Sequence, residues 1–342
     1  MKKINLALAI MVVLIANSAI SKAQSVTAPV GYVKYSIGVG LNAVGISLIN
    51  PDIVKAIVTS KTSTSITLDG QSNIGSLLTS TEPYYVEGYS GDSKGERFDV
   101  DGPATIAAGN AIVLSANSVN NSQEFNMGSV GIGDIVALRK QVTIKQLQDS
   151  VEASTGTGWV GSDDSSSADQ IMILDPVQQS FAIYYLRADG TTWRALSGRT
   201  DFSKAPIAAG RGIFVDKKEK PVNIAFVGCV RDNDFATPYY AGYDLKASPI
   251  PMDFSPASIG GTQQNNWTGS DTFTSADQIM IFNSDNQNFG IYYLRADGTT
   301  WRSTSDRANY KDSPLITSAG VYLVNKIAGD LGQVLNNPLP QN

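Results

Sequence analysis

Short segments in which apolar and polar residues alternate recur along this chain, and a period of two is typical of half-buried β-strands. The clearest case is Ile183 to Arg194 (IYYLRADGTTWR), where alternation flanks an Asp-Gly pair. This pattern predicts a β-hairpin, because Gly190 adopts the positive φ of the turn at low steric cost. Further strands are predicted at Gln170 to Leu174 and at Gly212 to Val215, each bounded by turn-forming residues.

Helical periodicity is scarce. The best segment is Ile144 to Val151, whose apolar residues share one helical face, and Thr143 with Gln146 forms a capping box at its start. A second short helix is expected after Pro51, at Asp52 to Ile57. These patterns predict a mostly β fold with one or two short helices.

An internal repeat is the strongest signal in the sequence. The segment from Trp159 to Val215 aligns without a gap on Trp267 to Leu323, and roughly half of the positions are identical. A fainter copy lies upstream, where Tyr84 to Val86 resembles part of the hairpin and Ile106 to Leu114 (IAAGNAIVL) resembles IAAGRGIFV. We therefore expect three related units in tandem.

The expected organisation has four parts, and each β unit is predicted to be a small sandwich or barrel-like fold. The parts are a signal peptide at residues 1–23, a degenerate β unit at 24–127, a second β unit at 128–227, and a third at 228–342 that closely repeats the second.

The amino-terminal segment has the composition of a signal peptide. Lys2 and Lys3 precede an apolar run from Leu6 to Ile15, and small residues lead to a predicted cleavage site after Ala23. The apolar run is shorter than the roughly 20 residues that a spanning helix needs. We therefore expect an exported protein, with no transmembrane segment after cleavage.

Charge and cysteine content exclude some classes of partner and crosslink. The formal net charge is −5, and removal of Lys2, Lys3 and Lys22 with the signal peptide makes it more negative by three. So acidic a protein has no electrostatic attraction to nucleic acid or anionic lipid. The single cysteine, Cys229, allows no intrachain disulfide, and its apolar surroundings predict a small buried side chain.

Three segments carry a resemblance to known sequences: GLNAVGISLINP at Gly40 to Pro51, YYVEGYSGDSKGERFDV at Tyr84 to Val100, and IAAGRGIFV at Ile207 to Val215. With them the chain resembles a group of uncharacterised exported repeat proteins of planctomycete and verrucomicrobial bacteria. The resemblance covers most of the mature chain. It implies export and a β architecture, and it implies no catalytic activity.

The chain contains no histidine, which excludes Ser-His-Asp and Cys-His catalysis and imidazole metal ligands. A carboxylate pair of the glycosidase type is the remaining catalytic option. No two glutamates recur at matching positions of the repeat. Asp163 and Asp169 do recur, as Asp271 and Asp277, beside Ser-rich loops, where aspartate is a common turn or capping residue. Their oxygens are also candidate Ca²⁺ ligands, although neither loop has the regular calcium-binding pattern.

All four tryptophans occupy equivalent positions in the two later units, at Trp159 and Trp193 and at Trp267 and Trp301. Exposed aromatic side chains on a β surface are suited to bind sugar rings, so the four are candidate glycan-binding residues. Burial of such a ring contributes about 4–6 kcal/mol, which equally explains its retention in a core. We favour the core for Trp193 and Trp301, whose hairpin partners are apolar, and leave both roles open for Trp159 and Trp267.

Four arginines flank the two predicted hairpins. We expect them to lie across each hairpin and to form exposed ion pairs with the turn aspartates, which contribute little to stability. The expected groups are Arg187, Arg194 and Asp189, and Arg295, Arg302 and Asp297.

These observations favour a noncatalytic structural protein of the cell envelope or extracellular matrix, with repeats that mediate self-association or contacts with other envelope proteins. The alternative is a carbohydrate-binding or adhesive module that uses the tryptophans. A third hypothesis is a polysaccharide-active enzyme that uses carboxylates. The expected location is the cell surface, the extracellular space or the periplasm.

Overall fold

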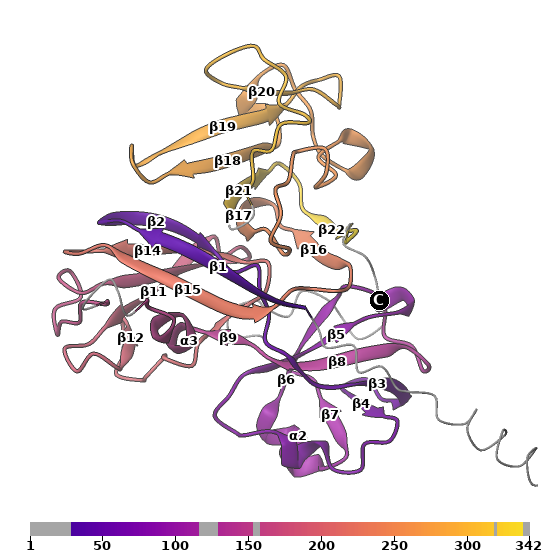
Figure 1. Cartoon of the computed structure of the whole chain (residues 1–342). Coiled ribbons are helices and arrows are strands. Elements are labelled where there is room, and N and C mark those ends of the chain that lie inside the picture. The colour runs from indigo at the N-terminus through magenta and orange to yellow at the C-terminus, as the bar shows by residue number, and fades with distance from the viewer. Residues whose placement is uncertain (1–28, 116–128, 153–157, 318–319, 338–342) are drawn as a thin grey trace, which may run out of the picture.

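The computed structural model describes residues 29–115, 129–152, 158–317 and 320–337 (Figure 1). The chain is mostly β, as the alternation of residues predicts. Its described strands form two five-stranded sheets, one six-stranded sheet and three two-stranded ribbons. The predicted signal peptide, residues 1–23, lies outside the described residues. Within the described part of the chain, no helix is long and apolar enough to cross a membrane.

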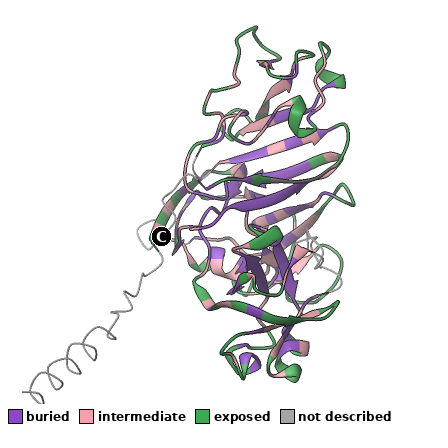
Figure 2. Ribbon diagram, turned by 90° about the vertical axis from the view of Figure 1, so that its right-hand side faces the viewer, coloured by how far each residue is buried: buried purple, intermediate pink, exposed green. Residues whose placement is uncertain are grey.

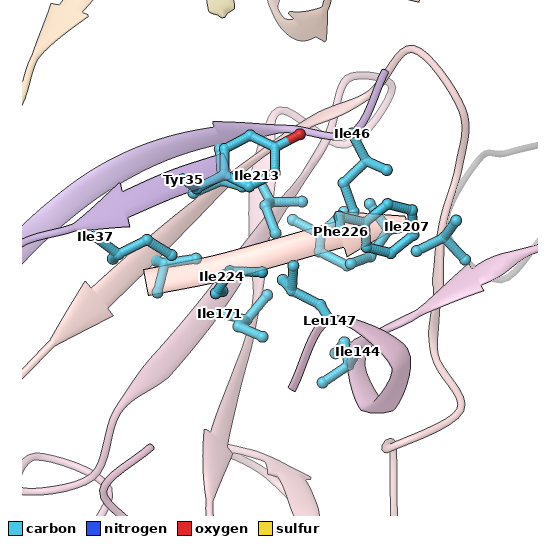
Figure 3. Packing of buried hydrophobic residues seen from close by; sticks show 14 of the residues in the cluster. Tyr35, Ile37, Ile46, Ile144, Leu147, Ile171, Ile207, Ile213, Ile224 and Phe226 are labelled. Carbon is cyan, nitrogen blue, oxygen red and sulfur yellow. The ribbon is translucent and has the colours of Figure 1, made fainter. Parts of the chain in front are cut away.

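The first core is built from two segments that are far apart in the sequence, residues 30–49 and 142–229, which we call unit A. Its five-stranded sheet has the order β12 (Trp193–Ala195), β11 (Ser180–Leu186), β10 (Gln170–Asp175), β14 (Gly212–Lys217) and β2 (Gly40–Gly45). Two ribbons pair β1 (Val30–Ile37) with β15 (Val222–Cys229), and β9 (Val142–Thr143) with β13 (Pro206–Ile207). Their apolar side chains pack between the strands and helix α3 (Ile144–Asp149) (Figure 3).

Residues 235–337 form unit B, which has the same strand order as unit A. Its five-stranded sheet runs β17 (Gly242–Ala247), β21 (Val321–Lys326), β18 (Gln278–Asn283), β19 (Asn288–Leu294) and β20 (Trp301–Ser303). Its ribbon pairs β16 (Phe235–Tyr239) with β22 (Asp330–Leu335). In Figure 1, unit B is the orange and yellow part at the top. Buried residues follow the sheets, and exposed residues concentrate in the loops (Figure 2).

Residues 52–140 form an inserted sheet between β2 and β9. Its strand order is β6 (Arg97–Val100), β5 (Tyr84–Gly88), β8 (Ile135–Lys140), β3 (Asp52–Lys61), β4 (Ser65–Leu68) and β7 (Ala111–Val113), and helix α2 (Gly102–Ala108) connects β6 to β7. The insertion has an apolar core of its own. The pairing does not confirm three tandem units, because β1 and β2 precede the insertion and yet complete unit A.

The first residues of the segment Ile106 to Leu114 do not have the same local structure as the matching residues of unit A. Residues Ile106 to Ala108 lie in α2, whereas the matching residues of unit A begin with strand β13. The difference arises because the Asp101 carboxylate accepts a hydrogen bond from the Ala104 N–H at 2.9 Å and caps a helix here. The two segments therefore differ at their start, although both continue into a strand, β7 or β14.

One of the two expected helices is confirmed and the other is wrong. The Thr143 hydroxyl accepts the Gln146 N–H at 3.2 Å and begins α3, as the capping pattern predicts. Asp52 to Ile57 instead lies in strand β3, where Val54 and Val58 are buried and the strand pairs with β4 and β8. Its β-branched residues suit the centre of a sheet better than a helix.

We expect Thr143→Ala to lower the free energy of unfolding by about 1 kcal/mol, because the first turn of α3 then loses its side-chain acceptor. Thr143→Ser keeps the oxygen and is the matched control. Urea unfolding followed by circular dichroism measures the difference. Equal stability of the two variants would show that the cap contributes nothing.

The repeat alignment shifts by one residue in its last strand. Sequence alignment without a gap places Val215 opposite Leu323, whereas the register of the sheets makes Phe214 the equivalent of Leu323. One extra residue in the loop before β21 accounts for the shift. Lys217 and Lys326 thereby become equivalent, and each ends its strand at the same buried position.

Units A and B pack against each other through equivalent surfaces. A Cβ atom added to Gly45 would lie 2.7 Å from the Cβ of Ala247, its equivalent in unit B. A Cβ added to Gly212 would lie 2.5 Å from Val321, again its equivalent. Contact of each position with its own counterpart is the property of a two-fold interface. The two units are therefore related by an approximate two-fold axis.

Two equivalent glutamines form reciprocal hydrogen bonds between the units. Gln179 of unit A accepts the N–H of Tyr243 at 2.7 Å and donates to its carbonyl oxygen at 2.9 Å. Gln287 of unit B accepts the N–H of Leu41 at 3.2 Å and donates to its carbonyl oxygen at 2.9 Å. Each glutamine thus holds the first residues of the other unit's edge strand, β17 or β2.

Candidate functional site

The four tryptophans form two pairs within the unit cores. Trp159 and Trp193 lie 5.3 Å apart between ring centroids in an edge-to-face arrangement, and Trp267 and Trp301 have the same separation. Trp193, Trp267 and Trp301 are at most 1% exposed, and Trp159 is half-buried against the core of unit A. The three buried rings are not available as an exposed platform for sugars, so their retention follows from packing.

Asp169 and Asp277, two of the candidate calcium ligands, each form a buried ion pair with a lysine. Lys217 Nζ pairs with the Asp169 carboxylate and donates to the Gly158 carbonyl oxygen at 2.9 Å. In unit B, Lys326 Nζ lies 3.3 Å from Asp277 Oδ2. Both carboxylates and both ammonium groups are buried. A bound cation would have to displace the lysine in each unit.

Backbone hydrogen bonds explain why these aspartates recur. The Asp169 carboxylate accepts the N–H groups of Val160 at 2.6 Å and Lys218 at 2.9 Å. The Asp277 carboxylate accepts those of Thr268 and Ile327 in the same way. Each aspartate therefore ties the loop before β10 or β18 to the end of the strand that carries the lysine.

The other two candidate calcium ligands also have cationic partners. Asp163 lies 2.6 Å from Arg187 Nη2, and Asp271 lies 2.5 Å from Arg295 Nη2. Among the residues that the structure describes, no three Cys, Asp or Glu side chains form a group that could hold a metal ion. The recurring carboxylates therefore balance basic side chains.

The turn aspartates close the hairpin loops and do not pair with the arginines as expected. Asp189 accepts the N–H of Thr192 at 2.8 Å, and Asp297 accepts that of Thr300 at 2.7 Å. Hydrogen bonds from Thr300 and its neighbour lower the pKa of Asp297 to about 2, and the equivalent bonds lower the pKa of Asp189. The loops are therefore held by a charged carboxylate at neutral pH.

A row of polar and aromatic side chains crosses one face of the five-stranded sheet of unit A. The register places Arg194 directly opposite Tyr185, and Tyr185 opposite Gln170. Residues opposed in this way project to one face, with Cβ atoms about 4.5–5.5 Å apart. Tyr184 and Leu186, the neighbours of Tyr185 along β11, are buried in the core. The row therefore faces away from that core, and Tyr185 and Arg194 are half-buried.

Unit B carries the same row. Arg302 is opposite Tyr293, and Tyr293 is opposite Gln278. Tyr293 and Arg302 are half-buried, as their equivalents are. The ring of Phe273 lies 6.4 Å from that of Tyr293 and adds a second aromatic side chain. We call these two surfaces the Tyr-Arg rows, Tyr185 with Arg194 and Tyr293 with Arg302.

Arginines whose guanidinium group has no ion-pair or hydrogen-bond partner in the described structure occur at two pairs of equivalent positions. Arg194 and Arg302 lie in the Tyr-Arg rows, and Arg199 and Arg307 lie in the exposed loops after β12 and β20. The Nε atoms of Arg194 and Arg302 are buried and have no hydrogen-bond acceptor. The other described arginines have partners; they are Arg97, Arg139, Arg187, Arg211, Arg231 and Arg295.

The sequence contained a signal for the Tyr-Arg rows, although the glycan-binding hypothesis considered only the tryptophans. Repeat identity covers both alternating sets of hairpin positions, whereas a core requires only one of them. Tyr184 and Leu186 face the core, but Ile183, Tyr185 and Arg194 do not, and all five recur in unit B. Identity on the solvent side of a strand indicates a duplicated surface.

An apolar cavity of about 320 Å³ opens between the two units. Its walls belong to the apolar cluster that joins the sheets, so it is a gap at the rim of that interface. The lining side chains include Met172, Phe181, Phe214, Tyr243, Phe289 and Leu323.

No family model, curated protein or solved structure matches this chain. The candidate site is therefore assigned from geometry alone. It consists of two equivalent sheet faces, each with a tyrosine opposite an arginine that lacks a partner.

Proposed function

We propose that the protein is a noncatalytic, exported component of the cell envelope or extracellular matrix that binds other macromolecules through its two Tyr-Arg rows. The observation that carries this proposal is the recurrence of unpartnered arginines at equivalent, half-buried positions, Arg194 and Arg302. A guanidinium group presents up to five N–H donors, and in both arginines the Nε donor is buried without an acceptor, which is costly. A ligand that supplies the acceptors explains why both units keep the residue.

The chemistry of the carboxylates supports a noncatalytic role. The recurring aspartates are engaged by lysine, arginine or backbone N–H groups, as described above. Glu87, a fully buried glutamate, forms ion pairs with Arg139 and Arg231. A general acid must instead hold a proton near neutral pH. Acid and base roles therefore have no candidate among these residues.

The sequence supports the part of the proposal that concerns export. The charged start, the short apolar run and the small residues before Ala23 form a signal-peptide pattern. The net charge of −5 disfavours nucleic acid as a partner. A matched pair of binding surfaces on one rigid body is suited to an adhesive or structural component, which links other molecules.

Binding to isolated envelopes and matrix of native cells tests the proposal. We expect the labelled chain from Gln24 onward to bind, and the variant Arg194→Gln with Arg302→Gln to bind about tenfold or more weakly, the effect of losing about 1.4 kcal/mol. The control variant Lys145→Gln with Lys220→Gln removes the same charge outside the rows and should bind like the unchanged protein. Equal binding by all three proteins would overturn the proposal.

A further inference from the structure

We infer that each Tyr-Arg row binds an acidic polysaccharide and that one protein molecule cross-links two polysaccharide chains. This inference rests on the proposed function and names its ligand. The two parts have separate grounds: the side chains and edges of the rows indicate the ligand class, and the two-fold relation between the units indicates the cross-link.

The rows combine the two groups that recognise an acidic sugar. A tyrosine ring offers an apolar face to the C–H groups of a pyranose ring. An arginine fork binds a carboxylate or a sulfate through two parallel N–H bonds. Register places Tyr185 opposite Arg194 and Tyr293 opposite Arg302, so each row presents both groups within one sugar's width. The Nε atoms of these arginines are buried, so the terminal N–H groups, for which the described structure shows no acceptor, are the ones that a ligand would meet.

Each row places one cationic side chain on the sheet face, although the protein as a whole is acidic. Arg187 and Arg295, which follow the rows along β11 and β19, are neutralised by Asp163 and Asp271. Among the basic residues of each hairpin, the arginine of the row is therefore the one without an ion-pair partner, while the turn aspartate, Asp189 or Asp297, carries the opposite charge. Because the overall charge repels a polyanion, binding depends on specific contacts at the rows and not on a diffuse attraction.

The outer edges of the hairpins argue against an acidic peptide as the ligand. Peptides commonly bind a sheet by adding a strand to a free edge. The Trp193 carbonyl oxygen on edge strand β12 already accepts the Phe202 N–H at 2.7 Å. The Trp301 carbonyl oxygen on β20 accepts the Tyr310 N–H at 2.8 Å. The chain's own loops thus occupy backbone sites on both edges, and recognition is left to the side chains of the face.

The two-fold relation between the units determines how many chains are held. A line that joins two equivalent sites crosses the two-fold axis, and rotation about that axis reverses the direction of the line. Polysaccharide chains have a direction, from the reducing to the non-reducing end. One straight chain therefore cannot pass through both rows in the same sense. Strands β12 and β20 also lie at opposite ends of the pair of units (Figure 1). Each row accordingly takes its own chain.

Binding and bridging assays with defined polymers test both parts. The probes are polygalacturonate and dextran sulfate, which carry carboxylate and sulfate groups, with neutral dextran and poly-L-glutamate as comparisons. We expect the chain from Gln24 onward to bind at least one acidic polysaccharide, to show no binding to dextran, and to bind poly-L-glutamate about tenfold more weakly. Equal affinity for poly-L-glutamate, or no binding to either acidic polysaccharide, would overturn the ligand class.

Single-site variants test the cross-link. Arg194→Gln alone and Arg302→Gln alone should each retain one binding site per molecule but no longer raise the light scattering of the polymer solution. The double variant should lose binding as well. Scattering that stays high in both single variants would refute bridging by two rows. Circular dichroism confirms that each variant is folded.

The two proposals fail in distinguishable ways. If native envelopes bind through the arginines but neither acidic polysaccharide binds, the ligand class is wrong and the proposed function remains. If the double variant binds envelopes as well as the unchanged protein does, the proposed function is wrong, whatever the polymers show.

Discussion

Lys217→Met is expected to lower the free energy of unfolding by about 3–5 kcal/mol, because it leaves the buried carboxylate of Asp169 without its cation. The ion pair is fully buried, and water cannot replace the ammonium group. Methionine keeps most of the volume of lysine, so the loss reflects charge more than packing. Guanidinium unfolding followed by tryptophan fluorescence measures the change.

The neighbouring lysine provides a matched control. Lys218 pairs with Asp216 at 2.6 Å, but its side chain is 25% exposed, so Lys218→Met should cost less than about 1 kcal/mol. Adding Asp169→Asn to Lys217→Met removes the uncompensated charge and should restore part of the lost stability. If Lys217→Met costs no more than Lys218→Met, the buried pair does not stabilise the fold as described.

Phe214→Ala is expected to destabilise the protein by about 3–5 kcal/mol and to uncouple unit A from unit B. Phe214 is 4% exposed and lies in the apolar cluster between the two sheets. Its ring centroid is 5.5 Å from that of Phe282 and 6.4 Å from that of Phe289, both in unit B. Differential scanning calorimetry should show a single unfolding transition for the unchanged protein and two transitions for the variant.

Phe181 is the control for this prediction, because it belongs to the same ring cluster at its rim. Its ring lies 5.9 Å from that of Phe214, and its side chain is 42% exposed. Phe181→Ala should cost about 1 kcal/mol and leave a single transition. An equal effect of the two substitutions would contradict a closely packed interface centred on Phe214.

The interface has a consequence for binding because it fixes the geometry of the two rows. Gly45 and Gly212 allow the sheets to approach so closely that any side chain would clash with the other unit. The rows are therefore held in one relative orientation, which a flexible linker could not provide. In the proposed cross-link, such a rigid body would transmit force between the two bound chains.

Residue periodicity alone predicted several local elements of units A and B. Alternation around the Asp-Gly pair predicts β11 and β12, and the Thr143 capping box predicts α3, because these elements depend on contacts within a few residues of one another. The misassigned segment was Asp52 to Ile57, whose structure depends on strands β4 and β8. Local sequence cannot report such neighbours.

The candidate site was predicted only in part. The repeat identified the right hairpins, but the tryptophans were the obvious aromatic residues and Trp193, Trp267 and Trp301 proved to be buried. Strand register decides which tyrosine lies opposite which arginine. The absence of a partner for Arg194 can be known only from the positions of every neighbouring carboxylate.

The sequence by itself determined that the chain is mostly β and that one segment is duplicated, because a period of two and a repeated run of letters need no knowledge of space. Only the tertiary structure decided that β1 and β2 complete a unit from across an insertion of residues 52–140, and that the two units meet about a two-fold axis. Both facts depend on pairing between residues far apart in the chain. Because the free-energy cost of closing a loop rises only slowly with its length, distance along the sequence does not indicate which segments pair.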